Sequence, residues 1–403
     1  MTTSLVKGFC RYFSTGTILL SQMIGLEIAP RQALATPPQF LVVGGGSSPC
    51  NNEIALEKNV LYFQRTLKEL GNQPQVATYL FANGNQSQTT VRYLDPQGLE
   101  QYKSPEIPYL KGAATLDNIS NWFNQFITQK KSNSIFFYYT GHGGENEKNS
   151  DNNYASLWQN SSFTVKGLAK LLDPLPPQTT FVAVMTQCYG GSFANFIYQD
   201  ANPRKKPAPQ NRCGFFATIK SQPSVGCTPL VNESDYRDYS SSFFAGLSGR
   251  DRVGKSVSSA DFDKDGRVSY REAHAFAKVD EKTPDLPIST SEAWLQRYES
   301  DKDRDILSEK PIAEILTSAR PEQYYVVESL TKFLNFKLPQ NLLENATNQT
   351  KSDLIDPQRN VYFRRLVMEL KNIHLEQKVR KTGDKEEINN LDRVLKCESG
   401  SLN

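Results

Sequence analysis

Residues 135–144 (IFFYYTGHGG) and residues 181–193 (FVAVMTQCYGGSF) each begin as an apolar run and then break into glycines. Each run has the length and composition of a strand that is buried on both faces of a sheet. His142 stands at the first break and Cys188 stands at the second. Because the carboxyl ends of parallel strands lie at one edge of a sheet, we expect the imidazole and the thiol to meet there.

The sequence on either side of these two strands alternates between strand and helix patterns. Apolar runs that end in a loop predict strands, and apolar residues at helical spacing predict helices. The strands are expected at 40–43, 76–81 and 214–219, and the helices at 53–70, 116–128, 164–172 and 239–247. This alternation predicts an α/β fold, a three-layer α/β/α sandwich around a mainly parallel sheet. Residues 85–113 are polar and broken by prolines, which indicates an excursion over the surface.

The character of the sequence changes at about residue 286. From there onwards charged stretches carry apolar residues at helical spacing, and no further glycine-ended strand follows. We therefore expect a sandwich domain over residues 36–285 and a helical C-terminal extension over residues 286–403. The charged end of this extension is expected to fray.

Residues 1–35 have the parts of a secretory signal peptide. Lys7 and Arg11 form a basic start, residues 13–26 are moderately apolar, and ALA at 33–35 fits a cleavage site. The alternative is a leader that is not cleaved. Export predicts a secreted, periplasmic or vacuolar/lysosomal protein, with no membrane segment beyond the signal peptide. The net charge of +3, without long runs of one sign, gives no support to a nucleic-acid partner.

Five of the six cysteines lie outside the predicted signal peptide. If Cys188 is kept for chemistry, Cys213 and Cys227 enclose a short loop that a disulfide could close. A loop of ~15 residues would gain about 3 kcal/mol of stability by this. In a reducing compartment the same two residues would instead be small buried apolar side chains. A bond between Cys50 and Cys397 would then use the remaining pair.

The chemistry of a reactive cysteine explains why the surroundings of Cys188 matter. A thiol attacks a carbonyl only as the thiolate, and an ordinary cysteine with a pKa of about 8.5 is mostly protonated at neutral pH. A neighbouring imidazole and a helix N-terminus both favour the thiolate. The glycines at 190–191 precede a predicted helix start, and those at 143–144 follow His142, so backbone N–H groups there could face a developing oxyanion. The structural alternative is a buried thiol and a hydrogen-bonded histidine.

Two motifs resemble those of a known group of enzymes. Residues 139–143 (YTGHG) resemble the His-Gly motif of caspase-fold cysteine peptidases, the group that contains caspases, metacaspases, gingipains and legumain. Residues 186–192 (TQCYGGS) are similar to the Cys motif of the same group. Residues 215–218 (FFAT) and 238–240 (DYS) look like two segments of legumain. The resemblance covers residues 39 to about 250 and implies a caspase-like sandwich of the legumain kind.

The resemblance also implies a reaction, the cleavage of a peptide or protein substrate through an acyl-enzyme. Cys188 would attack the carbonyl carbon, and His142 would protonate the leaving amine or polarise the bond. The backbone N–H groups of Gly143 and Cys188 would bind the oxyanion.

Four residues are candidates for binding the substrate. Asp238 matches the legumain acid that helps to receive an asparagine side chain, and Thr218 ends the strand motif that would line the pocket. Gln187 stands where metacaspases carry an acid that binds Arg or Lys. Glu53, on the loop after the first strand, could favour a basic side chain instead. The alternative for Glu53 is an exposed carboxylate in the first turn of a helix.

Residues 261–272 (DFDKDGRVSYRE) match the EF-hand calcium loop position by position. Gly266 fits the sharp turn at position 6, and the side after residue 270 predicts an exiting helix. The expected ligands are Asp261, Asp263, Asp265, the carbonyl group of Arg267, Ser269 and Glu272. The alternative is an acidic surface turn without a metal. A single loop of this kind in an exported protein is expected to stabilise the structure.

The sequence thus predicts an exported cysteine endopeptidase, legumain-like and stabilised by one Ca²⁺ ion. Transfer of the acyl group to an amine, in place of hydrolysis, is a close relative of this activity. The rival hypothesis from another class is a catalytically silent calcium-binding scaffold on a caspase-like fold. Thiol–disulfide exchange is disfavoured because the chain has no C-x-x-C motif.

Overall fold

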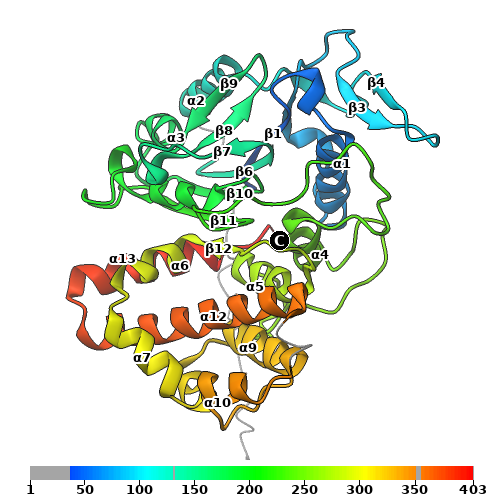
Figure 1. Cartoon of the computed structure of the whole chain (residues 1–403). Coiled ribbons are helices and arrows are strands. Elements are labelled where there is room, and N and C mark those ends of the chain that lie inside the picture. The colour runs from blue at the N-terminus through cyan, green and yellow to red at the C-terminus, as the bar shows by residue number, and fades with distance from the viewer. Residues whose placement is uncertain (1–36, 130–131, 351–354, 403) are drawn as a thin grey trace, which may run out of the picture. The chain divides into compact units, whose positions relative to one another are not determined.

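The computed structural model describes residues 37–129, 132–350 and 355–402. Its centre is a seven-stranded sheet in the order β12-β11-β10-β6-β1-β2-β5, which Figure 1 shows from one side. All neighbouring strands run parallel except β12, which pairs antiparallel with β11 at one edge. The strands are β1 Gln39–Gly45, β2 Thr78–Phe81, β5 Leu110–Gly112, β6 Ser134–Gly141, β10 Thr180–Met185, β11 Asn211–Phe216 and β12 Ile288–Ser289.

Both faces of the sheet are covered by helices, because the central strands are apolar on both sides. Along β6, Phe137 points into one core and Phe136 into the other. The first core is closed by α2 Leu116–Gln129, α3 Val165–Leu172, the 3₁₀ helix η4 Gly190–Ile197 and α6 Thr290–Leu295. The second is closed by α1 Ile54–Glu69, α4 Tyr239–Ser248 and α5 Tyr270–Asp280. The predicted three-layer α/β/α sandwich with a mainly parallel sheet is therefore confirmed.

One predicted strand is present with shifted bounds, and one segment predicted to be irregular contains strands. The fifth strand is β11, at Asn211–Phe216, and it begins earlier than the predicted 214–219. Its first residues look too polar for a core strand, but the buried Arg212 is paired with Asp173 at 2.9 Å. The polar segment 85–113 also contains strands: β3 Val91–Leu94 and β4 Glu100–Lys103 form a hairpin, and β5 joins the main sheet. A separate three-stranded sheet holds β7 Gly143–Gly144, β8 Tyr154–Leu157 and β9 Ser161–Thr164.

The C-terminal part is helical, as expected, but its end does not fray. Helix α13 Lys385–Glu398 packs on β10 and β11. Glu398 is buried, and its carboxylate accepts hydrogen bonds from the backbone and hydroxyl groups of Ser291. The remaining helices are α7 Asp301–Glu309, α8 Ile312–Ile315, α9 Pro321–Leu334, α10 Leu342–Thr347 and α12 Pro357–Thr382.

Both proposed disulfide pairings are wrong. Cys213 in β11 is bonded to Cys397 in α13, across a sequence separation of 184 residues. Cys50 and Cys227 are exposed free thiols, and Cys188 is a partly exposed free thiol. Sequence proximity favoured Cys227 as the partner of Cys213, but Cys213 points into the core at a place that α13 covers.

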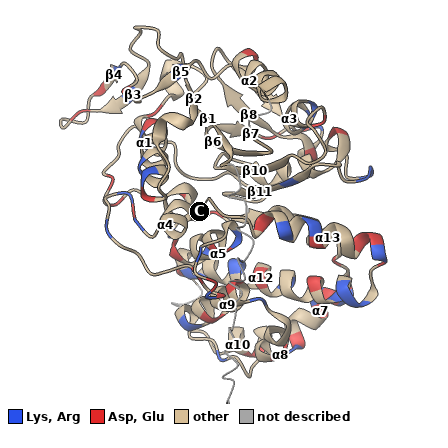
Figure 2. Cartoon of the chain, turned by 180° about the vertical axis from the view of Figure 1, so that it is seen from behind, with Lys and Arg blue, Asp and Glu red and all other residues tan. Residues whose placement is uncertain are grey.

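Charged side chains gather on the helices, and most of all on α12 and α13 (Figure 2). The strands β6 and β10 carry none. Among the described residues, no helix has both the length and the apolar character that a membrane span requires. The predicted signal peptide over residues 1–35 lies outside the described residues.

Candidate active site

The loop that carries His142 follows β6 directly and is fixed by Tyr139. The Tyr139 hydroxyl lies 2.8 Å from the carbonyl oxygen of His142 and 2.6 Å from that of Ser156, and its one hydrogen is shared between these two acceptors. A Cβ atom added to Gly143 would lie 2.5 Å from Cγ of Gln187 and 2.6 Å from the carbonyl oxygen of Cys188. Only glycine fits between the two loops, so the loops that follow β6 and β10 are in direct contact.

The imidazole of His142 is held by Glu53. Its Nε2 atom lies 2.9 Å from Oε2 of Glu53, and the other oxygen of this carboxylate accepts from Arg92 at 2.9 Å. Glu53 is 4% exposed, so the interpretation of this residue as an exposed first-turn carboxylate is wrong. Burial alone would raise the pKa of Glu53, but His142 and Arg92 outweigh it and hold the pKa below its usual value. The carboxylate is therefore ionised at neutral pH and orients the ring.

Cys188 lies three residues after the end of β10 and two residues before the start of η4. Tyr189, which follows it, has a left-handed backbone with φ of 59° and turns the chain into the glycine pair. The backbone N–H of Gly191 donates to the carbonyl oxygen of Thr218 at 2.8 Å, which anchors the start of η4 to the chain leaving β11. A Cβ atom on Gly191 would lie 2.8 Å from the backbone nitrogen of Lys220, so this approach also requires glycine.

A segment after β11 lies against the thiol; we call residues 222–228 the covering segment. The backbone N–H of Ser224 donates to Sγ of Cys188 at 3.3 Å, and Sγ donates to the carbonyl oxygen of Ser224 at 3.4 Å. The Ser224 hydroxyl donates to the carbonyl oxygen of Thr186 at 2.8 Å. Further along, the backbone N–H of Val225 donates to Asp285 at 3.0 Å. The covering segment thus occupies the space next to the sulfur.

Two of the candidate substrate-binding residues carry buried polar atoms without a partner. Gln187 is 1% exposed, and neither its amide nitrogen nor its amide oxygen has a hydrogen-bond partner among the described residues. The hydroxyl of Thr218 is buried and also has no hydrogen-bond partner among the described residues. Since burial of an unpaired polar group is costly, these atoms are suited to receive a partner that arrives from outside.

Asp238 has a different environment, because its carboxylate is already fully used. It is 1% exposed and caps the N-terminus of α4 by accepting from the backbone N–H and the hydroxyl of Ser241, at 2.8 and 2.5 Å. Asn59 and Ser240 donate to its second oxygen at 2.8 and 2.9 Å. Gly226 of the covering segment passes over it, since a Cβ atom there would lie 3.3 Å from Cβ of Asp238.

The acidic loop at 261–272 brings its first three acids together. The carboxylates of Asp261, Asp263 and Asp265 offer oxygen atoms that all lie within 4.8 Å of one another. Gly266 has φ of +89°, as the sharp turn requires. Glu272 is buried and accepts from the backbone N–H of Phe262 at 2.8 Å, while it closes a capping box with Ser269 at the start of α5. These residues fit a Ca²⁺ ion, and no helix of the described chain enters the loop, since α4 ends at Ser248.

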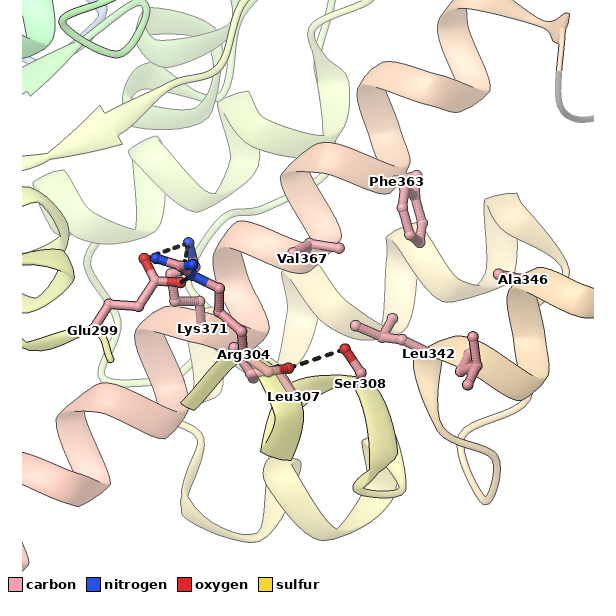
Figure 3. A pocket seen from close by; sticks show the side chains of 10 residues that line it. Glu299, Arg304, Leu307, Ser308, Leu342, Ala346, Phe363, Val367 and Lys371 are labelled. Atoms are coloured by element: carbon pink, nitrogen blue, oxygen red, sulfur yellow. Dashed lines mark hydrogen bonds and ion pairs between the residues drawn. The ribbon is translucent and has the colours of Figure 1, made fainter. Parts of the chain in front are cut away.

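One pocket lies beside the loop that carries Cys188, and another lies among the C-terminal helices. One, of about 370 Å³, reaches from Gly191 of η4 to Lys220 and Arg297. The other, of about 460 Å³, lies among α7, α10 and α12 and is lined by apolar residues such as Leu342 and Phe363 (Figure 3). The second pocket contains none of the candidate site residues, so it plays no part in the chemistry considered below.

The structure adds three residues to the candidate site that the sequence did not indicate. Arg92 comes from the unpredicted strand β3, and Ser224 and Cys227 come from a loop without a periodic pattern. The one sequence feature that could have indicated Ser224 and Cys227 is the position of their segment shortly after the motif at 215–218. The other histidines lie elsewhere: His274 is buried between Tyr239 and Glu292 in the second core.

Comparisons with known proteins leave the family open. The chain matches no protein-family model and no curated protein. Among solved structures it is similar to a secreted C11 cysteine protease from Bacteroides thetaiotaomicron in complex with an irreversible peptide inhibitor, with 13% sequence identity and a TM-score of 0.27. The match covers 53% of this chain and 54% of that one, so the chain spans about half the length of that protein.

Proposed function

We propose that the protein is a cysteine endopeptidase of the caspase-like, legumain-related kind, with His142 and Cys188 as its catalytic pair. The observation that carries the proposal is the contact between the loops after β6 and β10, which leaves no room for a side chain at Gly143. A buried carboxylate orients the imidazole on one of these loops. A partly exposed free thiol stands on the other.

The geometry supports a division of roles within the site. Cys188 attacks the carbonyl carbon of the substrate as a thiolate and forms a thioester, and the leaving amine takes a proton from His142. Glu53 fixes the ring and stabilises positive charge on it during this transfer. The backbone N–H groups of Gly143 and Cys188 are proposed as donors to the oxyanion. Water, or an amine in the transamidation variant, then releases the acyl group.

Substrate binding requires the covering segment to move. Ser224 occupies both hydrogen-bonding directions of the Cys188 sulfur, and Gly226 covers Asp238. Once the segment is displaced, a substrate side chain can meet the unpaired amide of Gln187 and the unpaired hydroxyl of Thr218. Asp238 takes part only if the substrate replaces one of the donors that its carboxylate now has. These groups favour a polar side chain before the scissile bond. A cleavage profile of the whole chain on a peptide library tests this, and cleavage that ignores the residue before the bond would contradict it.

Glu53 offers a sharper test of the mechanism. Glu53→Gln removes the charge but keeps the shape, so we expect kcat to fall roughly 100-fold through misplacement of the ring, with KM little changed. The pKa of Glu53 lies below its usual value, so its carboxylate supports the wild-type enzyme from neutral pH down into the acid range. The acid limb that comes from Glu53 should disappear from the kcat profile of the variant.

Glu57→Gln is the matched control for this test. Glu57, in the first turn of α1, is a buried carboxylate like Glu53. It pairs with Lys103 at 2.9 Å and has no ion pair with His142. Its substitution should leave kcat within a few-fold of the wild type. Equal losses in the two variants would mean that Glu53 acts through stability alone.

We also propose that the loop at 261–272 binds one Ca²⁺ ion. The ligands would be Asp261, Asp263, Asp265, Ser269 and Glu272 together with the carbonyl oxygen of Arg267, and the ion would tie the loop to the start of α5. At a calcium concentration 100 times the Kd, binding stabilises the fold by about 2.7 kcal/mol. Chelation should therefore lower the melting temperature.

Asp263→Ala should abolish the response of the melting temperature to chelation. Asp301, an acid at the exposed start of α7, provides the matched control, since Asp301→Ala should keep the full response. A melting temperature that does not change on chelation of the wild-type chain would refute the calcium site.

Export is proposed on two grounds. The first is the signal-like sequence at residues 1–35, and the second is the disulfide between Cys213 and Cys397, a bond that persists in oxidising compartments. A catalytically silent scaffold is the second candidate function, and the covering segment on Cys188 favours it. An activity-based thiol probe separates the two, because only the peptidase should be labelled at Cys188.

A further inference from the structure

Cys227 brings a second thiol to the catalytic histidine. Ligand atoms of Glu53, His142 and Cys227 all lie within 4.8 Å of one another, although the three residues come from separate parts of the chain. Glu53 precedes α1, His142 follows β6, and Cys227 lies on the covering segment. The proposed peptidase reaction has no use for this second thiol.

A carboxylate, an imidazole and a thiolate form a donor set that suits Zn²⁺. Zinc binds such donors at about 2.0–2.3 Å in a tetrahedron, which requires donor atoms to lie about 3.3–3.8 Å apart. The Nε2 atom of His142 and Oε2 of Glu53 are 2.9 Å apart, and the upper bound of 4.8 Å for the cluster leaves only small side-chain rotations to reach the required spacing. Calcium and magnesium prefer oxygen ligands, so the thiol argues against them.

The surroundings of the cluster hold its members in place. Arg92 donates to the Oε1 atom of Glu53, the type of outer contact that orients a metal-binding carboxylate. The covering segment is fixed on both sides of Cys227: Tyr236 donates to the carbonyl oxygen of Gly226 at 2.6 Å, and the backbone N–H of Ala55 donates to that of Thr228 at 3.3 Å. Cys227 itself is exposed, which gives an ion a path to the cluster from solvent.

We propose that Glu53, His142 and Cys227 form a zinc site that holds the protein in a covered, inactive form. The ion takes the ring nitrogen and carboxylate that the proposed reaction needs, and it ties the covering segment to the loop after β6. Binding releases the proton of the Cys227 thiol, and a water molecule completes the fourth position. The binding of the ion does not require the proposed peptidase activity, whereas the inhibition rests on that proposed function.

The test measures metal binding on the full chain with Cys188→Ala, so that neither catalysis nor the catalytic thiol contributes. Co²⁺ is the probe, because it takes tetrahedral zinc sites and gives a thiolate charge-transfer band when cysteine is a ligand. We expect the band to form with one equivalent of Co²⁺ and to be displaced by Zn²⁺. Adding Cys227→Ser should remove the band and weaken Zn²⁺ binding, measured by calorimetry, by at least about 100-fold.

Cys50→Ser is the matched control, since Cys50 is the other exposed free thiol and lies outside the cluster. It should leave both the band and the zinc affinity unchanged. Asp263→Ala should also leave them unchanged, which separates this site from the calcium loop. A band that survives Cys227→Ser, or zinc binding that is lost with Asp263→Ala and not with Cys227→Ser, would overturn the proposal.

Discussion

Replacing Cys188 with alanine is expected to abolish peptide cleavage, with a fall in kcat/KM of at least about 10³-fold. The proposed reaction uses the Cys188 sulfur as its nucleophile and uses no other. Its loss removes the thioester step, while Gly143 and the groups proposed to bind the substrate stay in place. The decisive measurement is turnover of the best library peptide together with labelling by a peptide-ketone probe.

Cys50→Ser is the matched control for Cys188→Ala, because it removes another accessible thiol from the same chain. It should retain full turnover and full labelling. The covering segment lies against the Cys188 thiol, so the wild type and both variants are measured before and after limited proteolysis. Cleavage by the Cys188→Ala chain at the wild-type rate would disprove the catalytic assignment.

Removal of the disulfide between Cys213 and Cys397 is expected to be the largest single loss of stability. Closing a loop of 184 residues restricts the unfolded chain strongly, and the chain-entropy relation gives a loss of about 5 kcal/mol when the bond is absent. The double variant Cys213→Ala/Cys397→Ala should unfold at a much lower urea concentration than the wild type. Its m-value should rise, because an unfolded chain without the bond exposes more surface.

Two comparisons make the disulfide experiment specific. Cys50→Ser removes a free thiol but leaves the bond intact, so its urea midpoint should match that of the wild type. Reduction of the wild type should reproduce the double alanine variant. If the urea midpoint of the wild type does not change on reduction, the bond is not formed in solution.

The central strands could be predicted from the sequence because burial on both faces leaves them uniformly apolar. β6 and β10 are of this kind. The start of β11 could not be predicted, because the buried charge of Arg212 is neutralised by Asp173, and that pairing exists only in the folded chain. The hairpin of β3 and β4 could not be predicted either, because both strands are short and β4 is polar and mostly exposed.

The candidate site shows the same division. His142 directly follows a recognisable strand and Cys188 lies three residues after another, so the topology of a parallel sheet predicts that they meet. The environment of Glu53 depends on Arg92 from the unpredicted hairpin, and its burial could not be inferred from a first-turn position. The covering segment carries no periodic signal, and its contacts with Cys188 and Asp238 are set by tertiary structure alone.

The pairing of Cys213 with a residue of the last helix has a consequence for the order of events during biosynthesis. Cys227 emerges from the ribosome well before Cys397 and is the nearest thiol to Cys213 along the chain. An early bond between Cys213 and Cys227 would therefore be kinetically favoured, and it would draw the covering segment away from the histidine. The bond that joins α13 to β11 can then form only by thiol–disulfide exchange after α13 has been synthesised. Rearrangement of the early disulfide is therefore expected to be the slow step in forming the native protein. A disulfide isomerase should accelerate this step, whereas an oxidant alone should not.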